Sequence, residues 1–116
     1  MLSDKAKQAL LDIQANAALA RSFVAGLSFE QFAADRKGFY AVTRALEIIS
    51  EAARRLPPDL RERHPSLPWR AIMGVGNIYR HDYDAVDEDL VWRTLRERLP
   101  ALETAVATEI ERSAEI

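Results

Sequence analysis

The chain has 116 residues, of which 48% are apolar and 29% are charged, a composition typical of a globular protein and not of a disordered or collagen-like one. This length predicts a single domain over residues 1–116. Cysteine is absent, which excludes disulfides, thiolate zinc sites, iron–sulfur clusters and cysteine nucleophiles. The net charge of −2 disfavours a constitutive, non-specific nucleic-acid binder, because that class is usually basic.

The N-terminal segment lacks the basic region and apolar stretch of a signal peptide. No apolar run approaches the roughly 18 residues that a membrane span needs. Together with the absence of cysteine, these features predict a cytoplasmic protein that makes no contact with a membrane.

Apolar residues recur every three or four positions through the first half of the chain, which predicts helices. Ser3 is expected to cap the first helix, and Ser28 with Gln31 predicts a capping box before a short helix over Phe29–Ala34. A long helix should then span about Asp35–Arg55. The apolar stripes expected in the two long helices are Leu10, Ile13, Ala17, Ala20, Val24 and Leu27, and then Val42, Ala45, Leu46, Ile49, Ala52, Ala53 and Leu56.

The second half of the chain is divided by prolines. Pro57 and Pro58 should stop the long helix, and Asp59–His64 should form at most one short helix. A further helix is expected from near Trp69 to about His81. The last helix should run over roughly 87–115 with a heptad-like seam, and a proline inside it should kink it or start a new helix. The seam consists of Trp92, Leu95, Leu99, Leu102, Val106 and Ile110, and the proline is Pro100.

No segment shows the alternating pattern of a strand, so the predicted fold is all-α, an up-and-down four-helix-type bundle. The apolar stripes of this small bundle are rich in alanine and leucine. We therefore expect it to complete its burial by forming a homodimer. Both the seam of the last helix and the helix over residues 69–81 are candidate dimer surfaces.

The charged residues are unevenly distributed along the chain. Residues 54–80 contain six arginines and two acids, whereas residues 82–89 contain five acids and no base. Such a dipole would steer a phosphate or a charged protein partner. The alternative is that these charges are scattered over a solvated surface and have no common partner.

Most catalytic motifs are missing from the sequence. There is no glycine-rich phosphate loop, no HExxH zinc motif and no GxSxG serine motif. The two histidines, His64 and His81, are far apart in the chain, so a zinc site would need carboxylate ligands at both. We expect neither a metal nor a cofactor, and we expect His64 to have a structural role.

The segment from Trp69 to Tyr83 is the part of the chain that carries chemistry. If it is helical, Ile72, Val75 and Tyr79 form a core face, and another face carries Asn77, Arg80 and His81. Gly74 and Gly76 weaken this helix, which indicates close approach of another backbone or of a ligand. Trp69 and Trp92 are expected to anchor the core or an interface.

An amide, a guanidinium and an imidazole on one face suit a phosphodiester. Arginine presents a planar fork to phosphate oxygens, and histidine transfers protons near neutral pH. RNA supplies its own nucleophile, the 2′-hydroxyl. One histidine cannot easily act as both base and acid, but a two-fold dimer would bring a second His81 to a shared groove. The alternative is that Arg80 and His81 only cap the helix, with their charges against its C-terminal dipole.

Several landmarks, in a fixed order, resemble the HepT-like branch of the HEPN family. They are LSFEQF, LEIISEAARRLP, PWRAI, the segment Asn77–Tyr83 and LVW at the start of the last helix, and the resemblance covers roughly residues 2–110. It implies an all-α bundle that dimerises about the motif helix. It also implies a metal-independent ribonuclease toxin, encoded beside an MNT-type nucleotidyltransferase antitoxin that neutralises it.

The family motif is an arginine, four to six residues that include an asparagine, then histidine, one residue and tyrosine. Asn77, His81 and Tyr83 match its last three positions. In several members the partner adds AMP groups to the tyrosine, so the resemblance makes Tyr83 a candidate modification site. The family's arginine falls at Gly76, and we expect Arg80 to take over the guanidinium role.

Two hypotheses about function follow. In the first, the protein is a homodimeric endoribonuclease with His81 as general acid and base, Arg80 as the clamp on the phosphate and transition state, and Asn77 as orienting group. Cleavage would leave a 2′,3′-cyclic phosphate. In the second, the helical dimer does not cleave RNA and binds its nucleotidyltransferase partner or a nucleotide, and Gly76 marks the loss of cleavage. A plain helical scaffold remains if the resemblance is accidental.

Overall fold

The computed structural model describes residues 2–81 and 87–114, and over residues 78–81 it describes the backbone alone. All regular structure in the described residues is helical, which confirms the predicted all-α fold. The helices are α1 (Asp4–Phe23), α2 (Phe29–Ala34), α3 (Arg36–Arg54), α4 (Pro58–Glu62), α5 (Trp69–His81), α6 (Glu88–Arg93) and α7 (Leu99–Ala114), with a π-helical segment, η2 (Thr94–Arg98), between the last two. None of the described helices is long and apolar enough to cross a membrane.

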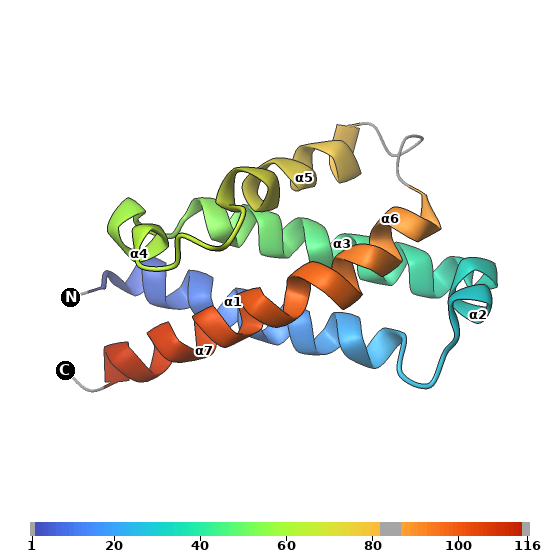
Figure 1. Cartoon of the computed structure of the whole chain (residues 1–116), viewed down its shortest axis with the longest axis horizontal. Coiled ribbons are helices and arrows are strands. Elements are labelled where there is room, and N and C mark those ends of the chain that lie inside the picture. Colours follow the sequence, from blue (N-terminus) through green and yellow to red (C-terminus); the bar gives the residue numbers. More distant parts are fainter. Residues whose placement is uncertain (1, 82–86, 115–116) are drawn as a thin grey trace.

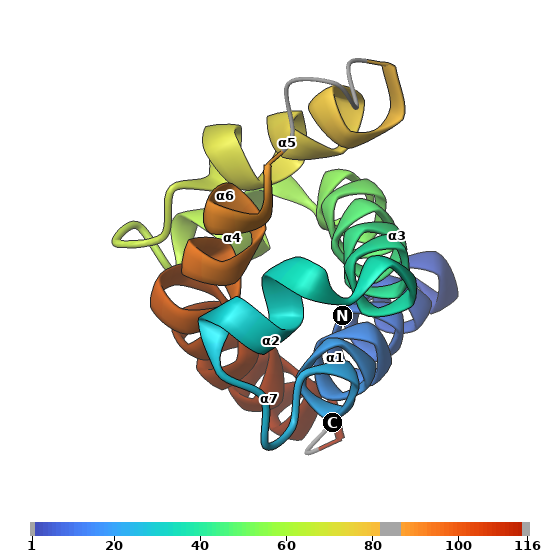
Figure 2. The same cartoon turned by 90° about the vertical axis from the view of Figure 1, so that its right-hand side faces the viewer.

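The long helices pack around one hydrophobic core. Figure 1 shows α1, α3 and the continuous α6–α7 rod along the length of the molecule, and Figure 2 shows α5 at the edge of the bundle beside α3. The apolar stripes predicted for α1 and α3 supply much of this core, together with Phe32 of α2. Its buried members include Leu10, Ile13, Ala17, Ala20, Val42, Ala45, Leu46, Ile49, Ala52, Ala53 and Leu56.

Side-chain caps set the first helix boundaries where the sequence predicts them. The amide of Ala6 donates to Ser3 Oγ at 3.1 Å. Ser28 and Gln31 form the predicted capping box, with bonds of 2.9 and 3.1 Å in the two directions. The carboxylate of Asp35 accepts from the amide of Gly38 at 3.0 Å and begins α3. Each cap satisfies a backbone donor that has no partner inside its own helix.

Pro100 does not end the last helix, and the helix continues through a widened turn. In η2 the amide of Leu99 donates to the carbonyl of Thr94, five residues back. Proline has no amide hydrogen and its ring crowds the preceding turn, so a π-helical turn just before Pro100 relieves both problems. The chain therefore keeps one continuous rod over the region where the sequence predicts a kink or a new start.

The seam of the last helix faces the inside of the chain. Leu95, Leu99, Leu102 and Val106 are all buried in the core. Trp92 packs on Phe29 and Phe32 of α2, with ring centroids 5.9 and 5.4 Å apart. The proposal that this seam is a dimer surface is therefore wrong, because the chain's own α1, α2 and α3 cover it. Of the two surfaces that the sequence offered, only α5 remains.

The cap at Asp35 provides a test of this fold. Replacing Asp35 with alanine should lower the free energy of unfolding by about 1 kcal/mol, because the amide of Gly38 loses its acceptor. Urea unfolding followed by circular dichroism measures the change. Asp35→Asn keeps an acceptor and should retain most of the stability. Equal losses in the two variants would contradict the capping role.

Candidate functional site

Helix α5 carries the motif segment and rests on α3. The helix starts after Pro68, whose carbonyl accepts from the amide of Ile72 at 2.9 Å. Ile72 is buried and Val75 is partly buried, as predicted for the core face. α5 packs chiefly on α3, and Figure 2 shows it on the outside of the bundle.

At Gly76, α5 approaches α3 closely. The amide of Gly76 donates to Ser50 Oγ at 3.0 Å, and a Cβ added to this glycine would lie 2.7 Å from Ser50 Oγ and 2.9 Å from Ser50 Cβ. The prediction of a close approach is confirmed at Gly76, and the approaching element is helix α3. At Gly74 an added Cβ would meet no described atom within 4 Å, so no described backbone approaches there, and approach of a ligand stays a prediction.

This contact leaves no room for an arginine side chain at position 76. A side chain at this position would collide with Ser50, so an arginine could fit only if α5 moved away from α3. Asn77, the next residue, is exposed. On an ideal helix, position 80 lies about 40° around the axis from position 76 and about 60° from position 77, one turn further along. Position 80 is thus the neighbour of both on the helix surface.

The remaining predicted site residues are only partly described. Arg80 and His81 lie in the last turn of α5, and their side chains are outside the described residues. Tyr83 falls outside the described residues altogether, as does the side chain of Tyr79. That Asn77, Arg80 and His81 share one face therefore stays a prediction from helical spacing.

Polar side chains from α3 and α4 hold the middle of α5. The carbonyl of Met73 accepts from Ser50 Oγ at 3.0 Å and from Arg54 Nε at 2.8 Å. Nη1 of Arg61 contacts Met73 Sδ at 2.6 Å. Sequence reasoning did not single out these residues. The one available signal was a serine, Ser50, inside the apolar stripe of α3.

A small apolar cleft of about 40 Å³ lies on the bundle side of α5. Its walls come from α3, α5 and the rod formed by η2 and α7, so α5 is not packed against that rod as it is against α3. The residues that line it are Leu46, Ile49, Ser50, Ala71, Ile72, Val75, Thr94, Arg98, Leu99 and Leu102.

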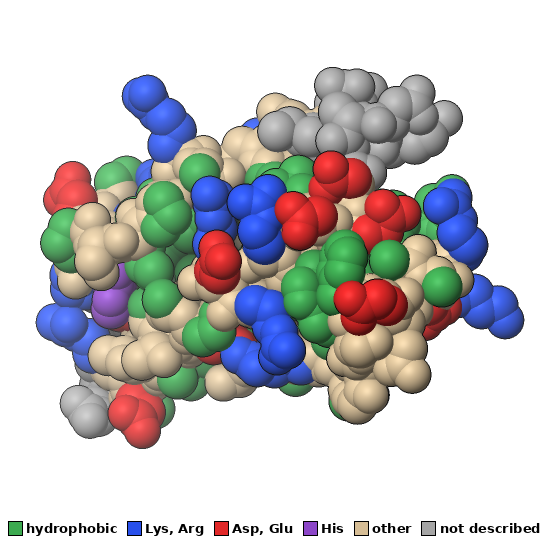
Figure 3. Space-filling view, turned by 45° about the vertical axis from the view of Figure 1, so that its right-hand side comes forward, with side chains coloured by type: hydrophobic (Ala, Val, Ile, Leu, Met, Phe, Trp, Pro, Cys, Tyr) green, Lys and Arg blue, Asp and Glu red, His purple; other side chains and the backbone are tan. Residues whose placement is uncertain are grey.

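The charged residues near the site are mixed in sign. Asp87, Glu88 and Asp89 form the acidic start of α6, which follows the motif segment in the chain. Figure 3 shows acidic side chains gathered beside the grey atoms, with basic side chains on the adjoining surface. The visible face thus places the two signs next to each other and does not present a continuous basic surface.

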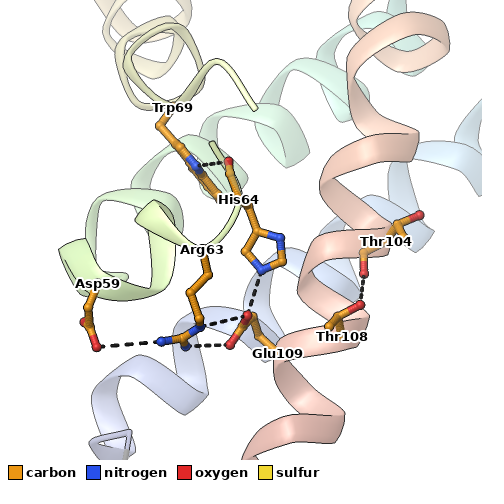
Figure 4. A network of polar contacts seen from close by, with 7 residues as sticks. All are labelled: Asp59, Arg63, His64, Trp69, Thr104, Thr108 and Glu109. Atoms are coloured by element: carbon orange, nitrogen blue, oxygen red, sulfur yellow. Dashed lines mark hydrogen bonds and ion pairs between the residues drawn. The ribbon is translucent and has the colours of Figure 1, made fainter. Parts of the chain in front are cut away.

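His64 belongs to a structural network at the other end of the molecule (Figure 4). The carboxylate of Glu109 on α7 is 1% exposed and lies 2.7 Å from Arg63 Nη2 and 2.7 Å from His64 Nε2. Nε1 of Trp69 donates to the carbonyl of His64 at 3.0 Å. The network therefore fastens the start of α5 to α7, and the structural role predicted for His64 is confirmed.

The two histidines of one chain do not come together. In Figure 1, α4 lies near the chain termini, whereas α5 runs away from them and ends well along the bundle, toward the end where α2 lies. Among the side chains that the structure describes, no group of three or more potential metal ligands is found. His64 thus cannot supply the second imidazole for a site at His81 of the same chain.

Burial and hydrogen bonding act in opposite directions on Glu109. Burial alone raises the pKa of its carboxyl group, because it disfavours the charged form. Hydrogen bonds from Arg63 and His64, together with their charges, outweigh burial and lower this pKa below its ordinary value of 4.5. The same hydrogen bond raises the pKa of Arg63. Glu109 is therefore ionised and paired at neutral pH.

Glu109→Gln should lower the free energy of unfolding by about 3 kcal/mol at pH 7, because it leaves Arg63 without its buried carboxylate. The pKa of Glu109 is lower in the folded than in the unfolded chain, so this contribution is present above pH 4.5 and is lost as the pH falls toward the folded-state value. Urea unfolding at several pH values measures it. The variant and the wild type should converge in acid, and Glu111→Gln, an exposed change on the same helix, should have little effect.

Comparison with known proteins places the chain in a family. Residues 13–109 match the family described as Ribonuclease HepT-like. A protein of Thermococcus cleftensis named "Probable ribonuclease HepT" is 38% identical over 96 residues, which cover 83% of this chain and 87% of that protein. A candidate RNase of Methanocaldococcus jannaschii is 36% identical over 100 residues, which cover 86% of this chain and 92% of that protein.

A third relative, a candidate RNase of Caldanaerobacter subterraneus subsp. tengcongensis, is 40% identical over 83 residues, which cover 72% of this chain and 74% of the relative. No solved structure gives a significant match. The family match covers most of the chain, including the whole of α5, and agrees with the resemblance found in the motif segment. The chain therefore belongs to the HepT-like ribonuclease family.

Proposed function

We propose that the protein is a metal-independent endoribonuclease, the toxin of a HepT/MNT-type toxin–antitoxin pair. The observation that carries this proposal is the arrangement of α5 in a chain of the HepT-like ribonuclease family: Gly76 is buried against α3, and Asn77 beside it is exposed. The motif segment thus begins at a turn that is fixed on one side and open to a ligand on the other.

The proposed reaction needs no group from outside the protein and the RNA. The imidazole of His81 takes the proton of the 2′-hydroxyl, and the 2′-oxygen attacks phosphorus. The bond from phosphorus to the 5′-oxygen breaks, and that oxygen receives a proton from the second imidazole. The products are a 2′,3′-cyclic phosphate and a 5′-hydroxyl. Arg80 stabilises the charge on the phosphate oxygens, and Asn77 orients the imidazole or the phosphate.

The packing of Gly76 supports the transfer of the guanidinium role to Arg80. An arginine at position 76 would have to displace Ser50, whereas position 80 lies one turn further along the same side of α5. A guanidinium supplied from position 80 leaves the contact of α5 with α3 intact. The chain therefore keeps both the tight helix contact and an arginine next to His81.

A homodimer about α5 supplies the second imidazole. α5 packs chiefly on α3 and lies at the edge of the bundle, so two copies can meet along it. Such a two-fold arrangement brings the two His81 residues to one groove, one as base and one as acid. The seam of α7 is already covered within the chain and does not compete with this surface.

The proposed partner is an MNT-type nucleotidyltransferase antitoxin in the cytoplasm. Tyr83, two residues after His81, is the candidate acceptor of AMP groups. Phosphates added there would place negative charge where the phosphate of an RNA substrate has to bind. This modification would switch off the same site that cleaves RNA.

Purified protein should cleave RNA in the presence of EDTA, and His81→Ala should lower the rate by at least about 100-fold, because it removes the proton-transfer group. Gel analysis of end-labelled RNA, with detection of the cyclic phosphate, measures both. Arg80→Ala should also lose most activity, whereas Arg70→Ala, an exposed change on the same helix, should lose little. Equal activity of His81→Ala and the wild type would remove His81 from the mechanism.

Sedimentation equilibrium should give a mass twice that of the 13.1 kDa chain. A single-chain mass at the concentrations used for the cleavage assay would contradict a groove shared by two copies of His81. The measurement should be made on wild-type protein and on His81→Ala, because the variant must keep the dimer if its loss of activity is to be assigned to the imidazole.

The second candidate function is a helical dimer that does not cleave RNA and binds its nucleotidyltransferase partner or a nucleotide. The observation that favours it is Gly76 at the position of the family's arginine. Expression without the partner distinguishes the two functions. Growth arrest that depends on His81 indicates the ribonuclease, whereas harmless expression of soluble dimeric protein indicates the binding module.

A further inference from the structure

We infer that Ser50 is a positioning residue for the site on α5, which fixes the height and the rotation of this helix on α3. The inference rests on the proposed function, because the groups to be positioned are Asn77, Arg80 and His81. Ser50 is 1% exposed and lies within the apolar stripe of α3. Its hydroxyl donates to the carbonyl of Met73 and accepts from the amide of Gly76, each at 3.0 Å.

The hydroxyl is used differently from other hydroxyls of the bundle. Serine and threonine inside a helix commonly donate to a carbonyl of the preceding turn of their own helix. Thr43 of α3 does so, with Oγ1 at 2.7 Å from the carbonyl of Phe39. Ser50 instead bonds twice to the backbone of another helix. A residue needed only to fill space here could be alanine, which carries no polar group to be satisfied.

The two bonds hold the turn that presents Asn77. In an α-helix the carbonyl of residue 73 accepts from the amide of residue 77, and the amide of residue 76 immediately precedes it. Ser50 therefore hydrogen-bonds to the backbone at the start and at the end of this turn. Arg80 and His81 follow within the next turn, so a shift of α5 at Ser50 would move all three groups together.

Because α5 and α3 approach closely at Gly76, the position of α5 is sensitive to the size of residue 76. An added Cβ at position 76 would lie well inside contact distance of Ser50. A side chain there would therefore force α5 away from α3. The apolar cleft beside this contact has Ser50 in its own wall and is otherwise lined mainly by apolar side chains, so it offers few other polar groups to hold the helix backbone. The polar restraints on this turn thus come from α3, through Ser50 and the neighbouring Arg54.

The experiment compares Ser50→Ala with Val106→Ala, a truncation of the core on α7 that lies away from α5. Ser50→Ala should lower kcat for RNA cleavage by about tenfold or more and leave KM within about twofold, because the reacting groups are displaced while binding surface remains. Val106→Ala should lower the melting temperature at least as much and keep kcat. A loss of kcat that simply follows the melting temperature in both variants would overturn the inference.

The chain has two histidines, which gives a readout that does not depend on activity. In NMR spectra of the full-length protein, Ser50→Ala should shift the ring signals of His81, assigned with His81→Ala. The ring signals of His64, which is held by Glu109 at the other end of the bundle, should not move. If wild-type protein fails to cleave RNA, the proposed function fails, and the His81 signals still decide whether Ser50 positions the helix.

The size of residue 76 gives a second variant. Gly76→Ala should also lower kcat by about tenfold or more, because its Cβ would press on Ser50. Ser50→Gly makes room for that Cβ. The double variant Ser50→Gly with Gly76→Ala should therefore have a kcat no lower than that of Ser50→Gly alone. Additive losses in the double variant, or unchanged His81 signals and kcat in Ser50→Ala, would show that this contact does not position the site.

Discussion

The contact between α3 and α5 at Ser50 and Gly76 is the constraint on which the candidate site depends. A helix at the edge of a small bundle has few neighbours, and α5 packs chiefly on one of them. At such a contact, a glycine allows the two backbones to approach, and a buried hydroxyl then bonds directly to backbone polar groups of the second helix. The same approach that excludes a side chain at position 76 leaves Asn77 at the surface.

Contacts in the N-terminal helices and in α7 stabilise the two helices that form this contact. Caps at Ser3, Ser28 and Asp35 fix where the first helices begin, and the hydrophobic core packs α3 against α1. The ion pairs of Glu109 secure the loop before α5 and, through Trp69, the first residue of α5. α5 is thereby held at its start by α7 and at its middle by α3, and its last turns carry the motif.

This arrangement gives a physical account of the glycine at position 76, where the family resemblance leads us to expect arginine. A bundle that places glycine where arginine is expected gains a close helix contact, and it must supply a guanidinium from another position if it is to bind a phosphate. Arg80 stands one turn further along, directly before His81. In the proposed ribonuclease, Gly76 packs α5 against α3, and the following turn carries the groups that act on RNA.

The sequence by itself determined the helices, the caps at Ser3 and Ser28 and most residues of the core, because these follow from local spacing and from side chains that bond within four residues. It also indicated the family and the motif. It could not determine that the seam from Leu95 to Val106 is covered within the chain, or that Pro100 is absorbed by a π-helical turn, because both depend on which helices become neighbours. Nor could it assign Ser50: its partners lie 23 and 26 residues away, and only the packing of α5 on α3 brings them within hydrogen-bonding distance.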